Sequence, residues 1–194
     1  MPRSSRRMEK VKSVLRRRQP DLSVVLENIH DPHNVSAIFR SCDAVGVMGV
    51  ELVYTEEEFP GIGKKSSSSA HKWVSHRKHR SIAGCYTLLR EQGFTIYASR
   101  LSDDARSLYD LDMTQRTAIV FGNEHRGVSE DAAALADASF QIPMMGMIQS
   151  LNVSVAAAVC LYEALRQRLK SGISAGQKLD EDLLQRLYEE WIIR

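Results

Sequence analysis

Three short segments of this 194-residue chain carry the side chains that could do chemistry, and each follows a stretch rich in apolar residues. Residues 34–40 and 122–127 contain Asn, Arg and Glu side chains, and residues 143–152 form a loop of small and flexible residues around Gly146. In open α/β sheets, ligands bind at the carboxyl ends of the strands. Because each segment follows a predicted strand, we expect all three to contribute to one ligand site at that edge of the sheet.

The residue types in these segments favour orientation and charge stabilisation over covalent catalysis. The orienting groups are Asn34, Glu124, Ser150 and Asn152. Arg40 is a planar, multidentate cation that suits phosphate. It lies opposite the apolar row of its predicted helix, so we expect it near the strand-end loops or in solvent. Taken singly, each polar residue could instead be a cap or a turn hydrogen bond, and for Asn34 and Ser150 that alternative is strong.

Several other classes of site are not indicated. The turn GNEHRG at 122–127 lacks the Gly-Lys-Ser/Thr ending of a Walker loop and is not a GxGxxG motif. The three cysteines are widely spaced among apolar neighbours, so we expect reduced core thiols, and no histidine stands beside Cys160 to activate it. The six histidines have no paired-ligand spacing, so no metal is expected. With no membrane-length apolar run and no signal peptide, we expect a cytoplasmic protein without a membrane partner.

Alternating patterns predict the elements that position these residues. Strands are expected at 23–29, 49–54, 73–80, 94–99 and 117–121, with helices at 35–45, 82–92, after Ser129 and from Leu151. The strand at 117–121, TAIVF, is the most apolar and should be central. The alternation predicts an α/β fold with a parallel-dominated sheet and helices on both faces.

The helix from Leu151 follows the third polar segment directly. Ser150 stands where its N-cap belongs, and the first turns are apolar nearly all round, which predicts burial. The tail is expected to direct Leu161, Leu165 and Leu169 inward and Glu163, Arg166, Gln167, Arg168 and Lys170 to water.

The net charge is only +2, but it is unevenly distributed. Residues 1–18 contain eight Lys/Arg and one Glu, residues 64–80 contain six Lys/Arg and no acid, and acids gather at 180–190. One electropositive face and a nucleic-acid partner are predicted. For residues 1–18, a solvated helix face with a loosely ordered tail is an even alternative. The candidate contacts are Arg16, Arg17, Arg18, Lys64, Lys65, Lys72 and Arg126.

We expect a basic helical extension at 1–20, one catalytic domain at 21–170 and a C-terminal helix within 171–194. The last helix carries an apolar row, Leu179, Leu183, Leu187 and Trp191, that could dock in cis or across a dimer.

Three stretches together resemble the motifs of one family. In order, NIHDPHNVSAIFRSCDAVGV, IVFGNEHRGVSEDAAALAD and IPMMGMIQSLNVSVAAAVCLYEALRQR are similar to the three motifs of the SpoU-type RNA 2′-O-ribose methyltransferases of the SPOUT superfamily. The resemblance covers about residues 20–170. The RRQPDL lead-in at 17–22 is similar to that of the TrmH type, the tRNA guanosine-2′-O-methyltransferases.

The resemblance implies methyl transfer from S-adenosylmethionine to a ribose 2′-hydroxyl, in the TrmH type guanosine 18 of the tRNA D-loop. It also implies a deep C-terminal trefoil knot that holds the cofactor, and a homodimer. By position, the cofactor contacts would be Ser99, Gly122, Ile142, Ser150 and Leu151, and the catalytic and structural polar set would be Asn34, Arg40, Glu124 and Asn152.

The resemblance gives Arg40 the role of activating the 2′-hydroxyl. A guanidinium resists deprotonation, so we favour the hypothesis that Arg40 binds the phosphate beside the target ribose and stabilises the developing alkoxide. Ribosomal RNA as substrate, and a non-catalytic RNA-binding dimer, are the alternatives. The catalytic motifs do not separate tRNA from ribosomal RNA, whereas an intact polar set argues against a pure binder.

Overall fold

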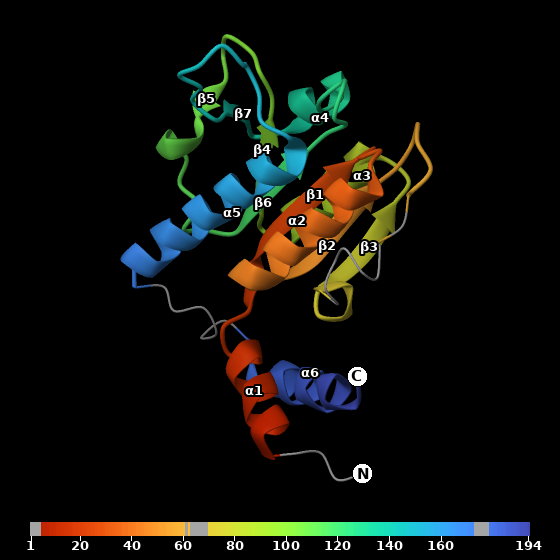
Figure 1. The fold of residues 1–194 in the computed structure, drawn as a ribbon, viewed down its shortest axis with the longest axis vertical. Helices are drawn as coiled ribbons and strands as arrows, with labels where there is room; N and C mark the ends of the chain where they lie inside the picture. The colour runs from red at the N-terminus through yellow and green to blue at the C-terminus, as the bar shows by residue number, and fades with distance from the viewer. Residues whose placement is uncertain (1–4, 61, 63–69, 173–178) are drawn as a thin grey trace.

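A seven-stranded sheet in the order β3-β2-β1-β6-β4-β7-β5 organises the computed structural model, which describes residues 5–60, 62, 70–172 and 179–194 (Figure 1). Every pair of neighbouring strands is parallel. The predicted α/β fold with a parallel-dominated sheet is confirmed. The strands are β1 Gln19–Glu27, β2 Val47–Val53, β3 Ser75–His79, β4 Thr95–Ser99, β5 Arg106–Ser107, β6 Thr117–Phe121 and β7 Ala138–Gln141.

Helices cover both faces of the sheet, as predicted. The helices are α1 Ser5–Leu15, α2 Pro32–Val45, α3 Ile82–Glu91, α4 Glu130–Leu135, α5 Val153–Lys170 and α6 Glu181–Ile193, with short 3-10 helices η1 Ala70–Lys72 and η2 Leu108–Asp110. Helices α2 and α5 share one buried core with the sheet, and α3 and α4 share the core on the other face. None of the described helices is long and apolar enough to cross a membrane.

Strand β6 is central and all five of its residues are buried, which confirms the prediction from its sequence. Successive side chains of a strand point to opposite faces. Ile119 and Phe121 accordingly join the core under α2 and α5, whereas Ala118 and Val120 join the core under α3 and α4. A strand buried on both faces needs apolar residues at every position, which explains the unbroken run.

Local signals set the ends of the first βα unit. Asp31 caps α2 by accepting a hydrogen bond from the backbone N–H of His33 at 2.7 Å, and Gly46 ends the helix at φ 90°. Strand β1 begins at Gln19, four residues before the predicted start, because the Gln19 N–H donates to the carbonyl of Gly46 at 2.7 Å. This earlier start brings the lead-in from α1 against the sheet.

Helix α5 differs from its prediction in three respects. Its N-cap is Asn152, whose side chain accepts from the Ser154 N–H, so Ser150 lies in the loop before it. Its first turns are not buried as predicted, because Val155 is exposed and Val153 and Ala156 are only partly buried. In the tail, Arg166 and Lys170 face water as predicted, but Tyr162 and Leu169 are exposed as well, with 65% of Leu169 accessible. The inward positions instead include two charged residues, Glu163 and Arg168. Arg168 is buried because it pairs with Asp21 at 2.7 Å, a partner 147 residues away in sequence.

The two terminal helices pack together below the sheet domain, where Figure 1 shows α1 and α6 side by side. Val11 and Leu15 of α1 form a small core with Trp191 of α6. Trp73, just before β3, packs on Trp191 with the ring centroids 5.1 Å apart. The C-terminal helix therefore docks in cis, the first of the two expected arrangements.

Candidate active site

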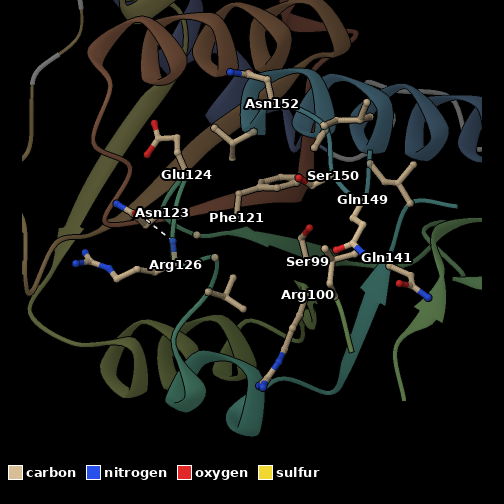
Figure 2. Close-up of a pocket in the computed structure, with 18 of the residues that line it drawn as sticks. Ser99, Arg100, Phe121, Asn123, Glu124, Arg126, Gln141, Gln149, Ser150 and Asn152 are labelled. Atoms are coloured by element: carbon tan, nitrogen blue, oxygen red, sulfur yellow. Dashed lines mark hydrogen bonds between the residues drawn. The ribbon is translucent and has the colours of Figure 1, made fainter. Parts of the chain in front are cut away.

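The carboxyl ends of β4, β6 and β7 meet the start of α5 around a cavity of about 660 Å³, shown in Figure 2. Phe121 and Phe140 give it apolar walls, and Gln141 and Gln149 add polar groups. All five residues that the sequence implied as cofactor contacts line it: Ser99, Gly122, Ile142, Ser150 and Leu151. The structure thus brings together residues that are up to 52 positions apart in sequence.

Gly122 is required by the close approach of two backbone segments. A Cβ at this position would lie 2.1 Å from the carbonyl carbon of Gly127 and 2.2 Å from the nitrogen of Val128. The turn between them is closed by the Gly127 N–H, which donates to the Asn123 carbonyl at 2.8 Å, and Gly127 itself has φ 71°. The loop 122–128 consequently folds back tightly and presents Glu124 at the edge of the cavity.

The carboxylate of Glu124 joins this loop to the start of α2. One oxygen accepts from the His30 N–H at 2.9 Å, and the other accepts from the Asp31 N–H at 3.1 Å and from Asn34 Nδ2 at 2.8 Å. Burial acts to raise the pKa of Glu124, but these hydrogen bonds outweigh burial and the pKa lies below its ordinary value. Glu124 is therefore ionised at neutral pH and acts as an acceptor that fixes Asn34.

Asn34 in turn contacts the third segment. Its Oδ1 accepts from Asn152 Nδ2 at 3.2 Å, and Asn152 Oδ1 accepts from the Ser154 N–H at 2.9 Å. Three of the four residues of the predicted catalytic set, Glu124, Asn34 and Asn152, thus form one hydrogen-bonded chain. Glu124 and Asn152 also line the cavity, where Figure 2 labels them.

Arg40, the fourth member, is not brought to the cavity. It follows Asn34 by six residues on α2, which rotates it about 240° around the helix axis. Its side chain is exposed and does not line the cavity. Within the part of the chain that the structure describes, Arg40 makes no hydrogen bond or ion pair, so its guanidinium is available to a phosphate. This is the solvent-facing placement that the apolar row of α2 predicted.

The basic candidates have different environments. Arg16, Arg17 and Lys72 are exposed, whereas Lys64 and Lys65 lie outside the described residues. Arg126 lines the cavity but pairs with Glu57 at 2.9 Å and Glu56 at 3.4 Å.

The structure corrects the prediction for Arg18. Only 1% of this residue is accessible, and its guanidinium pairs with Asp43 and donates to the Val47 carbonyl at 3.2 Å. It also lies over the ring of Trp191, 5.0 Å from the centroid. A guanidinium enclosed in this way cannot contact RNA, so Arg18 joins α1 and α6 to the sheet domain.

Two residues that the sequence analysis missed support the Glu124 loop. Asn28 ends β1 at φ 51°, and its Oδ1 accepts from the backbone N–H groups of Thr55 and Glu56 at 3.0 and 3.2 Å. The Asn28 carbonyl accepts from Asn123 Nδ2 at 2.8 Å. Asparagine tolerates the left-handed region, so an Asn directly after a strand is the signal that could have found Asn28.

A second support is buried Glu27, which holds the far end of the same loop. Its carboxylate accepts from the Ser129 N–H at 2.8 Å and from Ser129 Oγ at 2.6 Å. At the rim of the cavity, Arg100 and Glu130 form a bidentate ion pair with distances of 2.9 and 2.8 Å. No local sequence pattern predicts these pairs, because their partners are 30 to 102 residues apart.

Other chemistry finds little support at this site. Cys160 is buried in α5 and burial raises the pKa of its thiol, so it is not a nucleophile at neutral pH. Over residues 5–60, 62, 70–172 and 179–194, no three His, Cys, Asp or Glu side chains gather as a metal site would require.

The fold defines an α/β protein with a parallel sheet. Its cavity lies at the carboxyl edge of the sheet, where the loops 122–128 and 142–152 close it. Residues 21–162 match the SpoU rRNA Methylase family, so the chain belongs to this family and the resemblance of its three motifs is confirmed. Over 190 residues it is 50% identical to the tRNA (guanosine(18)-2′-O)-methyltransferase of Thermus thermophilus, covering 98% of this chain and 97% of that protein.

Solved structures agree with this assignment. The A. aeolicus TrmH/SpoU tRNA modifying enzyme has a TM-score of 0.90 and 38% identity, covering 97% of this chain and 95% of that one. The SpoU methyltransferase AviRb from Streptomyces viridochromogenes, solved in complex with AdoMet, has a TM-score of 0.71 and 27% identity, covering 79% of this chain and 62% of that one.

Proposed function

We propose that this protein transfers a methyl group from S-adenosylmethionine to the 2′-hydroxyl of guanosine 18 in the D-loop of tRNA. The observation that carries the proposal is that one cavity collects the five residues implied as cofactor contacts and has the Glu124–Asn34–Asn152 chain at its edge. The printed activity of the Thermus thermophilus relative supports the choice of substrate.

The residues of the cavity fit the cofactor. Its volume lies within the range of about 300–1,000 Å³ that is usual for small-molecule sites. Ile142, Leu151 and Val153 are partly exposed and offer apolar surface to a nucleoside base, and Ser99 and Ser150 offer hydroxyl groups to its polar atoms. Gly122 lets the main chain form part of the wall. When bound there, S-adenosylmethionine supplies an electrophilic methyl group.

The chain's own polar residues orient the RNA and stabilise charge. Glu124 is an ionised acceptor with three donors already in place, so it fixes Asn34 rather than moving a proton. Asn34 and Asn152 are the amide groups that position the target ribose. Arg40 binds the phosphate beside that ribose and stabilises the negative charge that develops on the 2′-oxygen.

Exposed basic residues supply the RNA-binding surface. Arg16 and Arg17 follow α1 directly, and Lys72 ends η1. In this arrangement residues 21–170 form the catalytic domain. Helices α1 and α6, from the segments 1–20 and 171–194, pack together and contribute to RNA binding. Modification of tRNA in this way is expected in the cytoplasm.

A homodimer is part of the proposal. Val155, Tyr162 and Leu169 recur at intervals of seven residues and form an exposed apolar row along α5. The loop before α5 also exposes apolar side chains, with 94% of Met145 and all of Met147 accessible. An apolar surface of this kind indicates a protein partner, and a second copy of the chain would cover it.

The deep trefoil knot that the resemblance implies is proposed for the C-terminal part of the catalytic domain. It is supported by family membership and by the placement of β7 between β4 and β5 in the sheet.

Methyl transfer from labelled S-adenosylmethionine tests the function. Unmodified tRNA transcripts and ribosomal RNA fragments are assayed in parallel, with calorimetry of cofactor binding to the protein alone. Incorporation into tRNA is expected. Incorporation only into ribosomal RNA would keep the chemistry and change the substrate, and cofactor binding without incorporation into either would contradict the proposal. Absence of cofactor binding would support the non-catalytic RNA-binding dimer.

A further inference from the structure

A second cavity, of about 510 Å³, lies where η1 and the start of β3 meet the end of α6. It is lined by His71, Lys72, Val74, Ser75, His76 and Arg194. None of these residues is acidic, and four of the six carry basic side chains. The cavity shares no lining residue with the one around Gly122, so it is a separate site.

Contacts between η1 and α6 hold the walls of this second cavity. Arg194 donates to the backbone carbonyl of Lys72 and pairs with Glu190. Next to Lys72, Trp73 packs on Trp191 of α6. The cavity is therefore built at the joint between the sheet domain and the α1–α6 pair.

Two of the lining side chains can donate to an anion. Lys72 is exposed, and its ammonium makes no ion pair with any residue that the structure describes. Burial, and next the charge of Lys78, lower the pKa of His76, so its ring is neutral at neutral pH and keeps one N–H donor. A cation next to a neutral donor suits phosphate, and the carboxylate of Glu190 is occupied by its ion pair with Arg194.

The second cavity adjoins α2, the helix that carries Arg40. The ring of His76 packs edge-on against Phe39, with the centroids 6.0 Å apart. Phe39 immediately precedes Arg40 on α2, and η1 contacts the same helix. An RNA strand whose phosphate is bound by Arg40 would thus extend over an adjoining element that offers another basic site.

We propose that this cavity binds a phosphate group of the RNA backbone, at a nucleotide other than the one whose ribose is methylated. The inference rests on the proposed function, because it takes RNA as the ligand. Lys72 provides the charge and His76 a directed N–H donor, and both act on one phosphate. Arg194 holds the backbone of Lys72 in place by donating a hydrogen bond to its carbonyl.

A double-mutant cycle on tRNA binding tests this subsite. The variants are Lys72→Gln, His76→Phe, which keeps the ring packing on Phe39, and the two together, each measured with unmodified tRNA transcript over a range of salt. Lys72→Gln should weaken binding and reduce the slope of log K against log salt by about one. His76→Phe should weaken binding with a smaller change in slope. Because the two residues share one phosphate, the double variant should lose less than the product of the two fold-changes.

Arg106→Gln is the matched control, because Arg106 is an exposed cation on β5 at the opposite edge of the sheet. Its tRNA affinity and salt slope should equal those of the wild type, and S-adenosylmethionine should bind all variants equally. The subsite would be overturned if Lys72→Gln weakened tRNA binding while His76→Phe did not. It would also be overturned if the free-energy losses of the two single variants simply added in the double variant. Neither result would affect methylation by the wild type. If the wild type methylates no tRNA, the proposed function itself fails, and this inference fails with it.

Discussion

At the scale of single residues, Glu124 is central to the proposed site because its carboxylate accepts three hydrogen bonds and fixes Asn34. We expect Glu124→Gln to lower the rate of methyl transfer by about 10- to 100-fold, because three donors lose a charged acceptor. Single-turnover methylation of tRNA measures this loss. Glu130→Gln is the control, since Glu130 also lines the cavity but is largely exposed and forms an ion pair with Arg100. Equal losses in the two variants would show that Glu124 has no special role.

The same carboxylate has a pH signature. Its folded pKa lies below the ordinary value of 4.5, so the stability it contributes is fully present above pH 4.5 and is lost as the pH falls through the lowered value. Urea unfolding of the wild type and of Glu124→Gln should therefore converge at acidic pH. A difference in stability that stays constant with pH would contradict an ionised Glu124.

Asn28 allows a separate test of backbone conformation. At φ 51° a glycine is tolerated and an alanine is strained, so Asn28→Ala should be less stable than Asn28→Gly by about 1 kcal/mol, although both lose the same side-chain hydrogen bonds. Denaturant unfolding gives the difference. If alanine is the more stable of the two, the left-handed conformation is not what selects Asn28.

At the scale of elements, the turn after β6 shapes the main cavity. We expect Gly122→Ala to weaken S-adenosylmethionine binding at least about tenfold, because its Cβ would overlap the backbone of Gly127 and Val128. Calorimetry measures the affinity. Gly146→Ala is the matched control, since a Cβ there meets nothing within 4 Å and Gly146 is not among the glycines with positive φ. Similar affinities for the two variants would place the cofactor elsewhere.

Sequence patterns predicted those elements whose signals are local. Strand β6 was recognisable because burial on both faces requires an unbroken apolar run, and the end of α3 because Gly93 follows it at φ 78°. The orientation of the tail of α5 was not recognisable. Arg168 turns inward because groups far away in sequence receive its guanidinium: Asp21 pairs with it, and the carbonyls of Met113 and Gln115 accept hydrogen bonds from it. Leu169, the next residue on the helix, is exposed.

The candidate site was predictable to a similar extent. Three strand-end segments pointed to one edge of the sheet, and Glu124, Asn34 and Asn152 do meet there. The supports at Asn28 and Glu27 depend on contacts across loops, which no periodicity records. The burial of Arg18 likewise depends on α6 folding back onto α1, and charge counting alone could not reveal it.

At the scale of the whole molecule, the apolar row on α5 links assembly to function. If a second copy covers this row, Tyr162→Asp should shift the protein to a monomer by burying an unpaired charge at the interface. Analytical ultracentrifugation reads the mass directly. Leu135→Asp is the control, because Leu135 is also exposed but lies on α4, which packs on the opposite face of the sheet from α5. A wild-type monomer, or a dimer that survives Tyr162→Asp, would contradict this interface.

The most direct test of the account is nucleotide-resolved mapping of the methyl group. An unmodified tRNA transcript is incubated with S-adenosylmethionine and the protein, and ribose methylation is located by mass spectrometry of nuclease fragments. The account predicts 2′-O-methylation at guanosine 18, lost in Arg40→Ala while S-adenosylmethionine binding persists, because Arg40 lies outside the cofactor cavity. Methylation at another nucleotide, or full activity of Arg40→Ala, would contradict it.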